Sequence, residues 1–200
     1  MKISEKLTNN NLISGKTVCA VFDNLYPDIL DLPITTGSSF MSSLWERYKN
    51  TSPSLNGSVF EGLIASILYR MDILPIYVQA KLAFVPNVDF DFILYSEEYG
   101  PIVLSAKTSL RERYKQADLE GMMLRQVHRQ AKTYLITLNA AEAKNVNTKI
   151  KNGQVLGIDS VIVATNKYFD ELLEKLRPLN FYKPEKVDVI LGQRIIEPLA

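Results

Sequence analysis

The chain has 200 residues, enough for one domain of ordinary size, and 46% are hydrophobic and 22% charged, as in soluble globular proteins. Its single cysteine and single histidine exclude a disulfide framework and metal sites built on cysteine or imidazole clusters. A formal net charge of +1 excludes a uniformly basic coat for nucleic acid but leaves room for local basic patches. The sequence shows no membrane span and no signal peptide. We therefore expect one cytoplasmic domain over residues 1–200, with no membrane partner.

Hydrophobic periodicity divides the chain into helices and strands. Apolar spacings of three and four residues predict helices, and β-branched runs bounded by Gly, Pro and Asn predict strands. Ser58 and Glu61 have the spacing of a capping box, which marks a helix start after a loop at 51–57. In chain order we expect a strand at 15–22, helices at 40–48 and 58–70, a strand or strand pair at 73–85, strands at 88–95 and 102–107 joined by a turn at 96–101, a helix at 109–132, strands at 134–138 and 155–164, a helix at 168–176 and a strand at 187–191. This order implies an α/β fold with a mixed β-sheet flanked by helices.

Two acids mark the strand expected before the turn at 96–101. Asp89 and Asp91 are two residues apart and share one face of that strand. Acids on a mostly apolar strand are costly without a cationic partner, and one hairpin register brings Lys107 beside Asp91. Hard oxygen ligands favour Mg²⁺, while the lysine would neutralise charge on a bound phosphate and orient water. The alternative interpretation is a simple surface ion pair on an edge strand.

The sequence of these two strands resembles the core of the PD-(D/E)XK nuclease superfamily. VDFDFILY at 88–95 and VLSAK at 103–107 match the core strands, with Ser105 where most members have an acid. That serine is similar to the S-x-K branch of type II restriction endonucleases, which cut sites with CCGG, CCNGG or CCWGG-type cores. In that branch the following helix supplies the missing carboxylate, and Glu120 lies thirteen residues after Lys107. The run KTSLRERYKQ, which begins at Lys107, is similar to the branch's K-T-S/T-x-x-x-R-W/Y-R/K-Q stretch.

The resemblance covers about residues 57–138 and implies a role for each residue of the site. It implies that Asp91, with Asp89 as the alternative, and Glu120 bind Mg²⁺. Lys107 would position water or stabilise the pentavalent phosphorus, and Ser105 would fill the acid's position without binding metal. The run GSVFE at 57–61 resembles the start of the superfamily's first core helix, whose glutamate reaches the metal in many members. Glu61 therefore has two interpretations, a metal ligand or the capping-box residue.

Charge is unevenly distributed around this region. Residues 89–98 hold four acids and no basic residue, whereas residues 107–132 hold seven Lys or Arg and three acids. The acidic segment suits a cation and the basic segment suits DNA phosphates. The helix predicted at 109–132 carries an apolar stripe that is expected to pack on the sheet and hold Glu120 near the strands. The stripe consists of Leu119, Met122, Met123 and Val127. The candidates for backbone or base contacts to DNA are Arg111, Arg113, Lys115, Gln116, Arg125 and Arg129.

The resemblance implies a single-domain type II restriction endonuclease that hydrolyses double-stranded DNA with Mg²⁺ and leaves 5′-phosphate and 3′-hydroxyl ends. Palindromic sites match two-fold symmetry, so we expect a homodimer. A repair, junction-resolving or modification-dependent nuclease on the same core is one alternative. A catalytically inactive DNA-binding protein, in which Ser105 marks decay of the site, is another.

Two further motifs are set aside. Residues 14–17, SGKT, resemble the end of a phosphate-binding P-loop but lack its first glycine and precede a predicted strand. His128 lies on a polar helix without a nearby carboxylate to orient it, so we expect a solvated or DNA-facing side chain.

Overall fold

The computed structural model describes residues 2–48, 52–85, 87–184 and 190–196, which form seven helices and six strands. In chain order these are α1 (Ile3–Asn9), α2 (Lys16–Leu25), α3 (Gly37–Arg47), α4 (Pro53–Arg70), β1 (Ile76–Leu82), β2 (Phe90–Ser96), β3 (Gly100–Lys107), α5 (Arg113–Val127), β4 (Lys132–Thr137), α6 (Ala140–Lys151), β5 (Ser160–Val163), α7 (Lys167–Leu176) and β6 (Ile190–Ile196). None of these helices is long and apolar enough to cross a membrane.

The strands form one mixed sheet in the order β5-β4-β3-β2-β1-β6. The pairs β3–β4 and β4–β5 are parallel, whereas the pairs β2–β3, β1–β2 and β1–β6 are antiparallel. The expected α/β class with a mixed sheet is confirmed. The pairing of β2 with β3 extends from the turn to Leu104, and β4 pairs with β3 as far as Lys107 at its C-terminal end.

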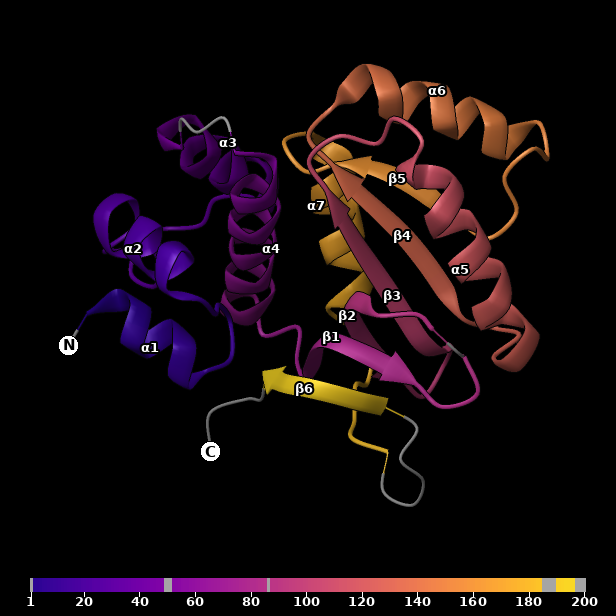
Figure 1. The fold of residues 1–200 in the computed structure, drawn as a ribbon, viewed down its shortest axis with the longest axis horizontal. Helices are drawn as coiled ribbons and strands as arrows, with labels where there is room; N and C mark the ends of the chain where they lie inside the picture. Colours follow the sequence, from indigo (N-terminus) through magenta and orange to yellow (C-terminus); the bar gives the residue numbers. More distant parts are fainter. Residues whose placement is uncertain (1, 49–51, 86, 185–189, 197–200) are drawn as a thin grey trace.

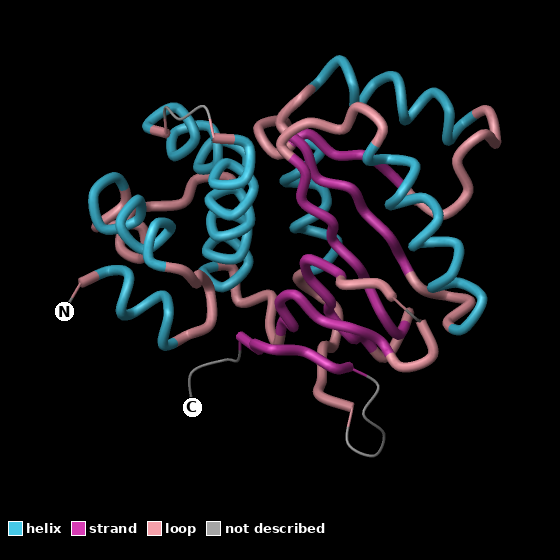
Figure 2. The backbone as a smooth tube through the Cα atoms, viewed as in Figure 1, coloured by secondary structure: helices cyan, strands magenta, loops and turns pink. Residues whose placement is uncertain are grey.

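Helices cover both faces of the sheet (Figure 1). Apolar residues of α1–α4 and α7 pack with one face in the largest hydrophobic cluster, whose centre includes Phe60 and Phe92. Helices α5 and α6 cover the opposite face around Leu135 and Val146. Figure 2 shows α1–α4 gathered as a helical group beside the sheet. Helix α4 thus lies between the sheet and the other N-terminal helices.

The N-terminal elements differ from the sequence predictions. The segment predicted as a strand at 15–22 belongs to helix α2, because Val18 and Phe22 are four residues apart and both are buried against the helical group. This removes one of the two reasons for setting the P-loop-like run aside, but the missing glycine remains. Helix α4 begins at Pro53, a residue type that suits the first helical turn, so the predicted loop is wrong over 53–57, and so is the capping box at Ser58. Residue 51 of that predicted loop lies outside the described residues.

Among the later elements, the strand predicted at 155–164 is reduced to β5 (Ser160–Val163), the helix predicted at 109–132 to α5 (Arg113–Val127) and the strand predicted at 73–85 to β1 (Ile76–Leu82). The predicted strands at 88–95, 102–107 and 134–138 and the predicted helix at 168–176 are observed with small changes of boundary. Helix α6 was not predicted, because its single apolar stripe around Val146 is short and interrupted by polar residues. The predicted strand at 187–191 lies mostly outside the described residues, and β6 begins at Ile190.

Strand β5 forms one edge of the sheet, and a side chain from α6 covers its backbone. Asn147 Nδ2 donates to Val161 O (2.7 Å), and Val161 N–H donates to Asn147 Oδ1 (2.9 Å). An edge strand is otherwise a template for pairing with another chain, so this amide protects the edge as well as anchoring α6.

Asn147→Ala is expected to lower the free energy of unfolding by about 1–3 kcal/mol, because it removes two hydrogen bonds to the backbone of β5. Urea denaturation would measure the loss. The matched control is Asn145→Ala, an exposed position on the same helix, which should change stability little. Equal effects from the two variants would contradict a special role for Asn147.

Candidate active site

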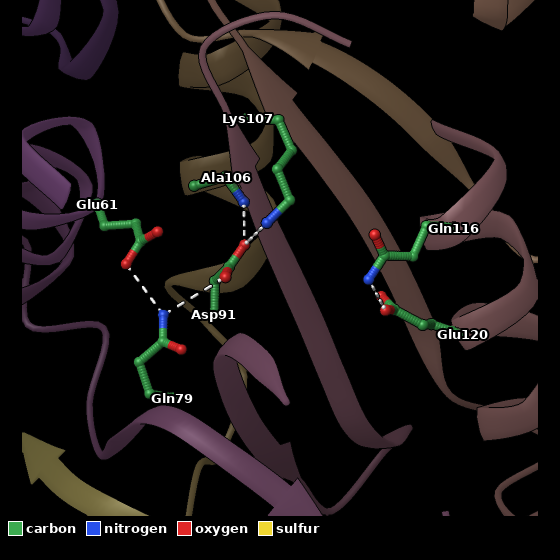
Figure 3. Close-up of polar contacts among 7 residues, drawn as sticks. All are labelled: Glu61, Gln79, Asp91, Ala106, Lys107, Gln116 and Glu120. Carbon is green, nitrogen blue, oxygen red and sulfur yellow. Dashed lines mark hydrogen bonds and ion pairs between the residues drawn. The ribbon is translucent and has the colours of Figure 1, made fainter. Parts of the chain in front are cut away.

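The β2–β3 hairpin brings Asp91 and Lys107 into contact. Phe92 pairs with Leu104, so Asp91 lies beside the last residues of β3, and Lys107 Nζ lies 2.8 Å from Asp91 Oδ2. The N–H of Ala106 donates to the same carboxylate oxygen at 2.8 Å. Asp91 is only 7% exposed. The register expected from the sequence is therefore the one observed, and it forms a largely buried ion pair rather than a loose surface one (Figure 3).

A second carboxylate reaches the site from helix α4. Gln79 Nε2, on β1, donates to Glu61 Oε2 (3.0 Å) and lies 3.4 Å from Asp91 Oδ1. Figure 3 shows this amide between the two acids. Because α4 begins at Pro53, Glu61 lies in its interior and is not a capping residue. Gln79 was not anticipated from the sequence, because a single glutamine on a predicted strand stands at no spacing from other polar residues that would identify it as part of a site.

Glu120 lies on α5 and points toward the strand that carries Lys107 (Figure 3). Gln116 Nε2 donates to Glu120 Oε1 at 2.7 Å. Burial raises the pKa of the Glu120 carboxyl; the hydrogen bond from Gln116 and the charge of Lys107 oppose that rise, and the charge of Asp91 adds to it. The charges of Lys107 and Asp91 thus act on Glu120, whose hydrogen-bond partner is Gln116.

The raised pKa of Glu120 predicts a stability effect with a definite sign. The carboxyl titrates near 4.5 in an unfolded chain and higher in the folded protein, so the folded state binds the proton more tightly. The destabilising effect of the ionised form is therefore fully present above the folded pKa and disappears as the pH falls below about 4.5. Glu120→Gln is expected to raise the melting temperature at pH 7 without Mg²⁺, and to leave it unchanged at pH 4. Thermal unfolding at the two pH values measures this, and a lower melting temperature at pH 7 would contradict it.

The remaining predicted ligands lie apart from these contacts. Asp89 precedes β2 and is exposed, with its Oδ1 3.6 Å from Lys81 Nζ. Ser105 is buried on β3. Within the part of the chain that the structure describes, no three His, Cys, Asp or Glu side chains are grouped closely enough to hold a metal ion by themselves. Gln79 links Asp91 to the Glu61 carboxylate on one side, and the Glu120 carboxylate lies on the other side of β3 (Figure 3). The three acids do not form a complete metal site by themselves.

The predicted DNA-contacting residues on and next to α5 fall into two groups. Arg111, Arg113 and Arg129 are exposed, and Lys115 is exposed and paired with Glu112. Arg125 instead binds within the protein, to Asp159 Oδ2 (2.6 Å) and to the carbonyl of Leu156. Gln116 is held by Glu120. Arg111, Arg113 and Lys115 lie just before α5 or in its first turn, Arg129 lies beyond its C-terminal end, and Arg125 anchors the loop before β5.

Helix α5 packs on the sheet through a different face from the one predicted. Its buried residues are Tyr114, Ala117, Gly121 and Leu124, while the predicted core positions Leu119, Met123 and Val127 are exposed. The cause is a close approach between Gly121 and Gly157, where a Cβ on either residue would overlap the other segment's backbone. The expected apolar stripe is therefore wrong as a packing face.

His128 is the C-cap of α5 and lies against Tyr95 with ring centroids 6.4 Å apart. Burial lowers the pKa of its imidazole, and its Nε2 is buried without a hydrogen-bond partner. The expected solvated or DNA-facing side chain is thus half-buried in the fold. It contributes to the end of α5 and not to the Asp91 cluster.

In comparisons with known proteins, the sequence matches no family model, and no curated protein and no solved structure matches the chain. The chemistry of the site is therefore considered from its own residues. A buried carboxylate touches an ammonium, and two further carboxylates lie on either side of it. Such a set can hold a hard cation through oxygen atoms while it presents a positive charge to an anionic substrate.

Proposed function

We propose that the chain is a type II restriction endonuclease that hydrolyses phosphodiester bonds of double-stranded DNA with Mg²⁺. The observation that carries this proposal is the contact of Lys107 with the buried Asp91, together with a half-buried Glu120 on which the charges of both act. The S-x-K motif and the glutamate on the following helix resemble the same branch of the PD-(D/E)XK superfamily. Sequence motif and geometry therefore favour the same reaction.

The residues present fit Mg²⁺ by their chemistry. Mg²⁺ takes oxygen ligands, keeps several waters and commonly uses only one or two carboxylates. Asp91 and Glu120 would supply these, and burial raises the pKa of Glu120 because its charge lacks full compensation, which a cation would provide. When bound, Mg²⁺ would neutralise charge on the scissile phosphate and make water more acidic. Asp89, which pairs with Lys81 at the surface, is the less suitable of the two strand acids.

The protein's own residues supply the rest of the chemistry. Lys107 is 28% exposed and held by Asp91, so its ammonium is fixed at the border between protein and solvent. There it would orient the attacking water and stabilise the negative charge that develops on the phosphorus oxygens. Arg111, Arg113 and Lys115 would bind backbone phosphates beside it. Ser105, buried on β3, would fill the space of the superfamily's usual acid without binding metal. Because such enzymes cut palindromes, we propose a homodimer.

Incubation of the purified protein with plasmid DNA and Mg²⁺ tests the proposal. A site-specific enzyme yields discrete fragments, loses activity with a chelator, and fails to cut DNA methylated at its own site. Lys107→Met, run in parallel, identifies a contaminating nuclease. A continuous smear would favour a repair nuclease, and cleavage of branched DNA alone would favour a junction-resolving enzyme. No cleavage of any duplex would contradict the proposal.

A further inference from the structure

We propose that Gln79 is a positioning residue that holds Glu61 and Asp91 at one spacing for the cleavage reaction. This inference depends on the proposed function for its catalytic meaning. Gln79 does not match any motif in the sequence, yet its amide contacts two acids from two different elements, α4 and β2. A neutral bridge of this kind keeps two carboxylates near each other without removing the charge of either.

The chemistry of the two partners determines the orientation of the amide. An ionised carboxylate only accepts hydrogen bonds, so both partners require the N–H groups of Gln79 and neither can use its oxygen. The distances, 3.0 Å to Glu61 Oε2 and 3.4 Å to Asp91 Oδ1, make Glu61 the closer partner. Asp91 Oδ2 meanwhile accepts from Ala106 and Lys107, so the two oxygens of Asp91 have separate partners. The amide therefore restrains the Asp91 carboxylate from the side opposite to Lys107.

The backbone of β1 is distorted at Gln79 itself. Its φ is +49°, a value that residues with a side chain rarely adopt outside turns. The registers of β1 with β2 and with β6 both pass from Val78 to Ala80 without pairing Gln79. Val78 packs in the cluster on the α4 side and Ala80 in the cluster beside Leu124, although two residues on a regular strand would share a face. A strained residue that aims its side chain at two acids is typical of a functional position.

Gln79 lies beside a cavity as well as beside the two acids. Together with Glu61, Ser14 and Ser58 it lines a cavity of about 280 Å³. Gln79 and Glu61 are therefore at the border of a space that a ligand could enter. Two variants separate the amide from the strained backbone. Gln79→Gly removes the amide but suits the positive φ, and Gln79→Glu keeps the length but adds a third carboxylate.

Cleavage kinetics at saturating Mg²⁺ provide the first test. Gln79→Gly should keep the wild-type melting temperature and DNA affinity while its kcat falls by about 10–100-fold, as when a supporting partner of a ligand is lost. Gln79→Glu should be impaired to a similar degree, because an ionised carboxylate cannot donate a hydrogen bond to either acid. Gln154→Glu, at an exposed position, is the matched control and should match wild type. A kcat within twofold of wild type for Gln79→Gly or for Gln79→Glu would overturn the inference.

A second measurement does not depend on DNA cleavage. In ¹H–¹⁵N spectra, the two side-chain amide protons of Gln79 should respond to different acids, one to Glu61→Ala and the other to Asp91→Ala. If wild type cuts no DNA but both responses appear, the proposed function fails and the bridge stands. If neither substitution shifts these protons, the bridge itself is refuted whatever the cleavage assay shows.

Discussion

Lys107→Met is expected to reduce DNA cleavage by about 10²–10³-fold, the usual effect of removing one group that stabilises developing charge. The ammonium lies 2.8 Å from Asp91 and is the cation closest to that acid in the contacts of the described residues. Methionine keeps much of the side chain's length and removes only the charge and its hydrogen bonds. DNA binding should weaken far less than kcat falls, since one phosphate contact at most is lost. Single-turnover cleavage and a binding assay without Mg²⁺ separate the two quantities.

The same substitution is expected to lower stability, by about 2–3 kcal/mol in urea denaturation, because Asp91 is 7% exposed and loses a charged partner. Lys81→Met is the matched control, since Lys81 also pairs with an acid near the start of β2 but across 3.6 Å between half-exposed side chains. Surface pairs of that kind contribute at most about 1 kcal/mol, and Lys81 lies outside the proposed site. If the two variants lost equal activity, the effect would come from the loss of any positive charge in this region and not from a specific role of Lys107.

Gly157→Ala is expected to destabilise the protein by about 3 kcal/mol, the upper range for forcing extra volume into a packed site. A Cβ at Gly157 would overlap the carbonyl of Asp118 and lie 2.6 Å from Met122 N, both backbone atoms of α5 that cannot rotate away. Asp118 also accepts the N–H groups of Leu156 and Gly157, so the loop and the helix are joined along this contact. Relief of the overlap requires α5 to move, and Glu120 moves with it. We therefore expect cleavage to fall in the fraction of protein that remains folded.

Urea denaturation and cleavage assays on three variants test this interpretation. Gly121→Ala places a Cβ against the carbonyl of Gly157, so its effect and that of Gly157→Ala should be less than additive, since one displacement of α5 relieves both overlaps. Gly57→Ala is the control: its Cβ would meet no atom within 4 Å, and alanine favours the interior of α4 by up to about 1 kcal/mol. A Gly157→Ala protein as stable as wild type would show that α5 does not depend on this contact.

The parts of the site that the sequence predicted correctly depend on short-range pairing. Asp91 and Lys107 belong to neighbouring strands joined by a short turn, so alternation and one register were enough to place them together. The α2 segment was mispredicted because Val18 and Phe22 fit a β-leaning run as well as a buried helical face. Gln79 was missed for a different reason. Its side chain reaches the acids through a left-handed backbone conformation, which hydrophobic periodicity does not encode.

The sequence by itself determined that strands at 88–95 and 102–107 form a hairpin with its acid and lysine, and that basic residues are concentrated after Lys107. These follow from side-chain alternation and turn residues, which act over a few positions. Only the tertiary structure decided which face of α5 is buried and that Glu61 and Gln79 join Asp91. The buried face of α5 depends on the contact between Gly121 and Gly157, which are 36 positions apart, and the grouping of Glu61 and Gln79 with Asp91 depends on the distorted backbone of β1 at Gln79. Both are set by packing between elements that are distant in sequence.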